Sequence, residues 1–122
     1  MKATTMRRTL LLAALALGMA APAAAQRSGT YDISGTNPDG TEYAGTMLLT
    51  QVGLSTFRVA WNIGPDIIEG VAMVSGLTLA TAFQLGQQPG MGIYELKPDG
   101  ALEGTWTTVG AFVAGRETAR PR

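Results

Sequence analysis

The sequence predicts an all-β fold, an eight-stranded antiparallel meander, and three observations support this prediction. Apolar and polar residues alternate with a period of two over most of the chain from Gly29 onward, as they do in half-buried strands. Sequences rich in Gly, Pro and Asp interrupt the alternation at short intervals, which is typical of strands joined by tight turns. No window after Gln26 carries an apolar 3.6-residue period long enough for a helix.

Turn sequences set the limits of the expected strands. The segments NPDG at 37–40 and KPDG at 97–100 place proline at the first corner of a turn and glycine where the chain needs a positive φ. The alternation is clearest in FRVAWNI at 57–63 and weakest over 84–90. The expected strands span residues 29–36, 42–51, 55–63, 66–74, 77–84, 91–97, 101–108 and 111–118.

A repeated pattern of an apolar residue, a spacer and glycine predicts that the sheet closes into a small barrel. Glycine weakens a strand, so its recurrence at equivalent places indicates strands that coil sharply or approach one another closely. A glycine-rich two-sheet sandwich is the alternative. The pattern occurs as Ile33-Ser34-Gly35, Tyr43-Ala44-Gly45, Ile68-Glu69-Gly70, Leu102-Glu103-Gly104 and Val113-Ala114-Gly115.

The alternation also predicts which side chains point into the barrel. An eight-stranded barrel is just wide enough to be filled by side chains or to hold one small ligand, and large residues nearly fill this one. The expected inward set is Tyr31, Ile33, Tyr43, Met47, Leu49, Phe57, Val59, Trp61, Ile63, Ile68, Leu79, Phe83, Tyr94, Leu96, Leu102, Trp106 and Val113.

The first 25 residues have the three parts of a secretory signal peptide. Lys2, Arg7 and Arg8 form a positive start, residues 10–17 an apolar helical segment, and AAA at 23–25 a cleavage site. The apolar run is short for a membrane span, so we expect cleavage near Ala25, a single β domain over 26–122 without a transmembrane segment, and a periplasmic or secreted location. Arg7-Arg8 leaves twin-arginine export open beside Sec export.

The composition excludes several classes of function. The chain has no His and no Cys, so it lacks the usual general base, thiolate nucleophile and imidazole ligand, and we expect no enzyme, metal or cofactor. Its acids are expected on turns and outward strand positions, with Glu69 and Glu103 on the solvent-exposed face, and they keep a carboxylate-based hydrolase open. Asn37, Asp39 and Glu42 faintly resemble a calcium loop, but a hairpin turn explains them. Removing residues 1–25 leaves six basic and nine acidic residues, a net charge of about −3, which argues against nucleic acid as a partner.

Two candidate contact surfaces remain. Tyr43, Trp61, Tyr94 and Trp106 are expected to point inward, where their polar tips would line a pocket for a small apolar ligand. The same aromatic residues are also consistent with a packed core. On the outer face, the row Ile67, Val71 and Met73 is a candidate contact for a protein partner, or else is buried under residues 84–90.

The motifs GTNPDG at 35–40 and YELKPDGALEGTW at 94–106, with GTY at 29–31, resemble those of short exported bacterial proteins, mostly uncharacterised, some labelled fibronectin-binding. The resemblance implies an envelope or secreted protein and supplies no catalytic residues. In outline the strand pattern is also similar to avidin-like and lipocalin-like barrels. We therefore expect an exported, non-enzymatic binding module of the bacterial periplasm or cell exterior, with a hydrolase or a purely structural envelope protein as alternatives.

Overall fold

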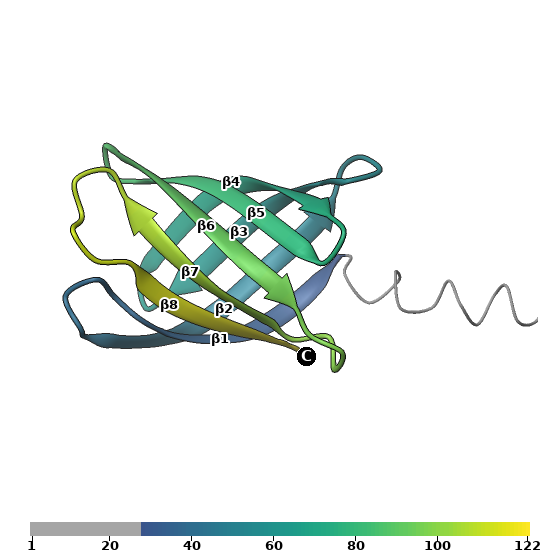
Figure 1. Cartoon of the computed structure of the whole chain (residues 1–122), viewed down its shortest axis with the longest axis horizontal. Helices are drawn as coiled ribbons and strands as arrows, with labels where there is room; N and C mark the ends of the chain where they lie inside the picture. Colours follow the sequence, from purple (N-terminus) through teal and green to yellow (C-terminus); the bar gives the residue numbers. More distant parts are fainter. Residues whose placement is uncertain (1–27) are drawn as a thin grey trace, which may run out of the picture.

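The computed structural model describes residues 28–122, which form a closed antiparallel barrel (Figure 1). The predicted barrel is confirmed, and the sandwich alternative is wrong. The predicted signal peptide, its cleavage site and Gln26 lie outside the described residues. The strands are β1 (Gly29–Thr36), β2 (Glu42–Gln51), β3 (Thr56–Ile63), β4 (Asp66–Ser75), β5 (Thr78–Leu85), β6 (Gln88–Leu96), β7 (Leu102–Thr108) and β8 (Gly115–Pro121).

Each strand pairs with its neighbours in the sequence, and β8 closes the barrel by pairing with β1, where Ile33 faces Ala119. The connections therefore alternate between two ends. The loop end, at the left of Figure 1, carries the connections 37–41, 64–65, 86–87 and 109–114. The terminal end carries 52–55, 76–77 and 97–101 together with the C-terminus. Among residues 28–122, no helix is long and apolar enough to cross a membrane.

The interior is packed with the predicted side chains. All of the expected inward residues except Val113 are buried or partly buried, and Met47, Leu49 and Phe57 are essentially inaccessible to solvent. Ala72, Ala101 and Ala119 add small side chains that the prediction did not include. Without a disulfide, this apolar packing and the closed ladder of backbone hydrogen bonds supply the stability of the fold.

The repeated glycines permit the close approach of neighbouring strands, as predicted. A Cβ atom on Gly45 would lie 2.1 Å from the carbonyl oxygen of Asn62 on β3, and one on Gly104 would lie 2.3 Å from that of Ile93 on β6. Gly35, Gly70 and Gly115 meet backbone carbonyl oxygens at 2.3–2.6 Å in the same way. These contacts are backbone to backbone, so a side chain at such a position forces the strands apart.

Two segments differ from the prediction. Residues 84–90 are not irregular: Gly86, with φ of 64°, makes the tight turn between β5 and β6, and β6 begins at Gln88 rather than at 91. The last strand begins at Gly115 rather than at 111, because residues 109–114 form a loop that turns at Gly110, with φ of 97°. Val113 therefore lies in this loop, 63% exposed, and not in the core.

The two Pro-Asp-Gly turns have the same geometry, as their sequences predict. In both, the first residue accepts a hydrogen bond from the glycine N–H, at 2.8 Å for Gly40 and 2.9 Å for Gly100, and both glycines have positive φ. The Asp39 carboxylate accepts hydrogen bonds from the N–H and hydroxyl of Thr41, and these bonds lower its pKa. The polar residues of 37–41 are therefore explained by the turn rather than by a calcium site.

Candidate functional site

The loop half of the barrel interior brings together four aromatic residues from four strands. Tyr43 lies on β2, Trp61 on β3, Tyr94 on β6 and Trp106 on β7. All four had been predicted to point inward, and each has its polar atom buried or hydrogen-bonded near the same place. The residue that connects them is Glu117 of β8.

Glu117 is a buried acid that accepts hydrogen bonds from three of these residues. Its side chain is 4% exposed. Tyr43 donates its hydroxyl to Oε1 at 2.7 Å, while the Tyr94 hydroxyl and Trp61 Nε1 donate to Oε2 at 2.5 and 3.2 Å. No base among residues 28–122 forms an ion pair with this carboxylate. All three of its donors are therefore neutral groups.

The environment of the two tyrosines favours their neutral, donating form. Burial raises the pKa of Tyr94 far above its ordinary value, and the charge of Glu117 and the hydrogen bond to it raise it further. Burial, then the charge of Glu117 and the hydrogen bond to it, also raise the pKa of Tyr43, while the neighbouring Trp106 side chain lowers it. Both hydroxyls therefore remain protonated donors to the carboxylate at neutral pH.

Trp106 carries the one buried side-chain polar atom within residues 28–122 that has no hydrogen-bond partner, its Nε1. The indole packs edge-on against Tyr43, with ring centroids 6.2 Å apart, and against Phe83 at 6.1 Å. Phe83 in turn contacts Trp61 at 5.3 Å. A buried N–H without an acceptor costs stability, so this atom is an unfilled hydrogen-bonding position in an aromatic wall.

These groups surround a small pocket that opens at the loop end. Its volume is about 80 Å³, well below the few hundred Å³ of a pocket that encloses a whole ligand. Below it, toward the terminal end, the core is filled. We call this space the loop-end pocket; it is lined by Asn37, Trp61, Ile63, Ile68, Phe83, Leu85, Tyr94, Trp106 and Glu117.

An apolar loop lies at the same end of the barrel. The connection 109–114 reads VGAFVA and joins β7, which carries Trp106, to β8, which carries Glu117. Phe112 is fully exposed and Val109 and Val113 are 65% and 63% exposed. Figure 1 shows this loop projecting beyond the strands at the loop end.

The remaining acids do not converge in an enclosed cleft. Glu69 and Glu103 are exposed on the outer face, as predicted. A broad, open groove of about 910 Å³ on the outer surface is bordered by Glu42, Glu95 and Glu103, all with exposed side chains, and also by Lys97, Arg116 and Glu117. In residues 28–122, no group of three or more acids could hold a metal ion.

The predicted outer row is exposed, and part of it belongs to a larger apolar area. Ile67, Val71 and Met73 are 67%, 60% and 54% exposed, so residues 84–90 do not cover them. Cross-strand pairing joins Val71 to Ala82 and Met91, and Met73 to Ala80 and Ile93. We call these six residues the outer apolar face. Ile67 lies apart from it, beyond Glu69 on the same strand.

Solved structures similar to this chain are β-barrels. A redesigned β-barrel superposes with a TM-score of 0.66 at 20% identity, over 83% of this chain and 95% of that one. A de novo designed fluorescence-activating β-barrel superposes with a TM-score of 0.62 at 18% identity, over 83% of this chain and 98% of that one. A variant of the fluorescent protein UnaG superposes with a TM-score of 0.51 at 15% identity, over 78% of this chain and 95% of that one. At these identities the similarity shows the fold. No protein-family model and no curated protein matches the chain.

Glu117 is the site residue that the sequence interpretation missed. The sequence prediction places the acids on turns and outward strand positions, whereas Glu117 points inward. The sequence does contain a signal for this position. If the alternation of inward and outward residues is continued from Gly115, residues 117 and 119 fall on the inner face, and the structure has both of them buried.

Proposed function

We propose that this protein is an exported, non-enzymatic binding module that holds a small, largely apolar ligand at the loop end of its barrel. The observation that carries the proposal is the loop-end pocket, whose aromatic-lined wall includes Glu117, a buried carboxylate, and Trp106, whose buried indole N–H has no hydrogen-bond partner. Ligand sites combine apolar walls with a few polar groups of this kind.

The size of the pocket limits what enters it. A space of about 80 Å³ accommodates a polar head group and not a whole ligand. The apolar body of the ligand then lies across the opening, against Leu85 and the exposed side chains of the loop 109–114. Covering Phe112 and Val113 in this way removes apolar surface from water, which favours binding.

Binding is a better account of this site than hydrolysis. Retaining or inverting glycoside hydrolysis needs two carboxyl groups on one cavity. Glu117 is the one acid that lines the loop-end pocket, and in the open outer groove that it also borders, Glu42, Glu95 and Glu103 are exposed to solvent. Its two carboxylate oxygens are also engaged by Tyr43, Tyr94 and Trp61. A carboxylate fixed in this way orients a ligand better than it transfers a proton.

The proposed location rests on the sequence of residues 1–25, whose charged start, apolar run and AAA site are those of a signal peptide. The resemblance of the 35–40 and 94–106 motifs to exported bacterial proteins supports the same location. Both support a location of the binding module in the periplasm or outside the cell.

The chain has two tryptophans, so two indole N–H signals in an NMR spectrum report on the site. We expect heptan-1-ol added to the purified protein to shift the signal of Trp106 saturably, with Trp106→Phe used to assign it. The variant Leu85→Trp, which narrows the opening, weakens the effect, whereas Val71→Ser on the outer apolar face does not. Absence of any saturable shift at the loop end contradicts the proposal and leaves a structural role.

The outer apolar face supports a second candidate, docking of an envelope protein. Its four large side chains are 54–60% exposed and form one contiguous area with two alanines between them. Fully burying such a side chain stabilises a complex by about 1.5–3 kcal/mol. Because these four are already partly covered, completing their burial contributes roughly 4–6 kcal/mol to the free energy of association. Association costs about 4–15 kcal/mol, so this face holds a partner only with help from further contacts.

Met73→Lys and Ile93→Lys distinguish this candidate from the first. If the outer apolar face docks a partner, both substitutions abolish capture of that partner from envelope extract while the Trp106 shift with heptan-1-ol is unchanged. If capture survives both substitutions, the face is not the docking surface.

A further inference from the structure

The charges of this barrel are segregated between its two ends. Among residues 28–122, the loop half carries five acids but one base: the acids are Asp39, Glu42, Asp66, Glu69 and Glu117, and the base is Arg116. The formal charge of these residues is therefore −4. Over the same described residues, the terminal half carries four acids and four bases and is neutral.

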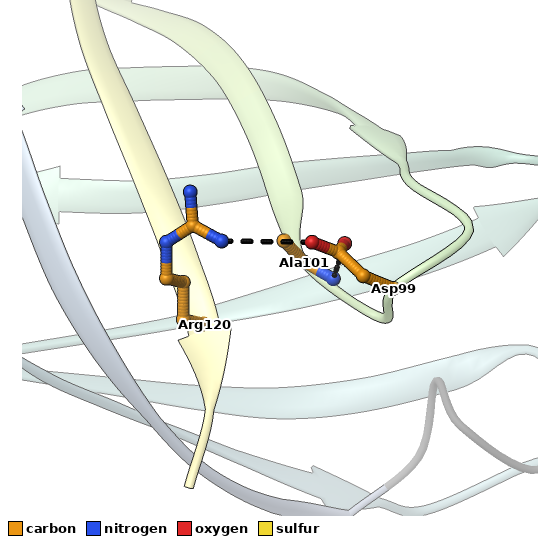
Figure 2. Close-up of polar contacts among 3 residues, drawn as sticks. All are labelled: Asp99, Ala101 and Arg120. Atoms are coloured by element: carbon orange, nitrogen blue, oxygen red, sulfur yellow. Dashed lines mark hydrogen bonds and ion pairs between the residues drawn. The ribbon is translucent and has the colours of Figure 1, made fainter.

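Ion pairing reinforces this difference. At the terminal end, Arg122 pairs with Asp32 at 3.0 Å and Lys97 lies 3.5 Å from Glu95. Arg120 lies 3.6 Å from Asp99, which also accepts the N–H of Ala101 in the turn between β6 and β7 (Figure 2). At the loop end, within residues 28–122, no acid has a basic partner.

The carboxylate of Glu117 has room for one further donor. A carboxylate offers about four acceptor positions, two on each oxygen. Trp61 and Tyr94 occupy both positions on Oε2, and Tyr43 occupies one on Oε1. One position on Oε1 remains, at a residue that lines the loop-end pocket.

Trp106 Nε1 supplies the complementary requirement. It is a buried donor without an acceptor, and its residue, Trp106, lines the same pocket as Glu117. A head group that satisfies both residues therefore presents a donor and an acceptor side by side. Trp61, Phe83 and Trp106 line the same pocket, and an aromatic ring also stabilises a cation that lies over its face.

We infer that the ligand of the loop-end pocket is an organic cation, a protonated amine on an apolar body, with a hydroxyl or carbonyl oxygen next to the amine. The ammonium donates to Glu117 and the oxygen accepts from Trp106. The unpaired acids around the opening attract the cation from solution. This inference rests on the proposed function, because it names the ligand class of the same site.

Four probes of matched chain length test the inference: heptylamine, 1-aminoheptan-2-ol, heptan-1-ol and heptanoate. Binding is measured by calorimetry and by the shift of the Trp106 indole signal. We expect heptylamine to bind at least about 10-fold more tightly than heptan-1-ol, because its ammonium adds an ion pair to the hydrogen bond that either probe donates to Glu117. Heptanoate binds most weakly, and 1-aminoheptan-2-ol most tightly.

Two variants distinguish recognition of the amine by the Glu117 carboxylate from attraction of the amine by the surface charge of the loop end. Glu117→Gln keeps the shape of the side chain and removes its charge, so heptylamine loses about 10-fold in affinity while heptan-1-ol is little changed. Glu69→Gln is the matched control at the same end, on the outer face, and changes heptylamine affinity less than about 2-fold. Trp106→Phe removes the advantage of 1-aminoheptan-2-ol over heptylamine. Retained indole and methyl dispersion in the NMR spectrum shows that each variant is folded.

The outcomes distinguish this inference from the proposed function. If heptan-1-ol binds as tightly as heptylamine, or if Glu117→Gln leaves heptylamine binding unchanged, the cation inference is wrong and the ligand site stands. If none of the four probes shifts Trp106, the proposed function itself fails. If Glu69→Gln weakens amine binding as much as Glu117→Gln, surface charge attracts the amine and Glu117 does not recognise it.

Discussion

Replacing Glu117 by leucine tests whether this carboxylate organises the loop half of the core. The substitution leaves the hydroxyls of Tyr43 and Tyr94 and the Nε1 of Trp61 without their acceptor. Each buried donor left unpaired costs about 1–3 kcal/mol. The share of Tyr43 is smaller because it is only partly buried and already approaches the carbonyl oxygen of Arg116, at 3.4 Å. Removing a buried charge also recovers part of its desolvation cost. We expect a loss of about 3–5 kcal/mol in the free energy of unfolding.

Glu117→Gln is the matched control, because an amide of the same shape keeps most of the hydrogen bonds. Its oxygen accepts from Tyr94 and Trp61, and its NH₂ group donates to the oxygen of Tyr43, which turns its own hydrogen toward Arg116. The bonds lose their charge, so we expect about 1–2 kcal/mol of destabilisation.

Urea denaturation followed by tryptophan fluorescence measures both free energies. Domains of this size have a total stability of roughly 5–15 kcal/mol, so the leucine variant shifts the midpoint far more than the glutamine variant at an unchanged slope. A leucine variant as stable as the parent would refute the reasoning, since the three donors would then not depend on the carboxylate. Equal losses in the two variants would assign the effect to charge rather than to missing acceptors.

Three further predictions concern packing, pH and export. Gly45→Ala places a Cβ 2.1 Å from the carbonyl oxygen of Asn62, so it lowers the free energy of unfolding in urea by about 1–3 kcal/mol, whereas Thr46→Ala on the outer face changes it by under about 0.5. Folding raises the pKa of Tyr94 and Tyr43. Their contribution to the free energy of unfolding is therefore complete below a pH of about 10, the pKa of tyrosine in the unfolded chain, and is lost as the pH rises above it. Stability measured from pH 9 to 11 therefore falls less steeply in Tyr94→Phe; an equal slope in the parent and the variant contradicts this. Mass spectrometry of the protein from a bacterial host is expected to show a chain that begins at Gln26, and full-length protein in the cytoplasmic fraction contradicts this prediction.

Local sequence patterns were sufficient to predict the barrel and most of its core. The alternation in 57–63 assigns Phe57, Val59, Trp61 and Ile63 to one face, and the structure buries or partly buries all four. The glycine repeat predicted close strand approach because only a residue without Cβ permits it, and the contacts of Gly45 and Gly104 have that cause. Signals of this kind involve neighbouring residues, so they are readable before the fold is known.

Glu117 was not predicted because its environment is made by residues distant in the sequence. An isolated acid in a strand is ordinarily solvated, and that rule applies correctly to Glu69 and Glu103. Glu117 departs from it because its donors come from Tyr43, Trp61 and Tyr94, on three other strands that barrel closure brings together. The register of β8, which begins after the loop 109–114, decides whether residue 117 faces those donors.

A combined substitution separates the role of this cluster in stability from its role in binding. Replacing a buried acceptor together with its donors by apolar groups is often nearly neutral, because no polar atom is left unpaired. In Tyr43→Phe/Tyr94→Phe/Glu117→Leu, Trp61 Nε1 alone loses its partner, so the triple variant recovers the free energy of unfolding to within about 1–2 kcal/mol of the parent. Heptylamine binding is nevertheless lost, because the carboxylate is gone. A triple variant less stable than Glu117→Leu would contradict this account of the hydrogen bonds. A triple variant that still binds heptylamine would show that the amine does not bind at Glu117. Recovered stability without binding would mean that the fold does not require the polar groups of the loop half, and that ligand recognition does.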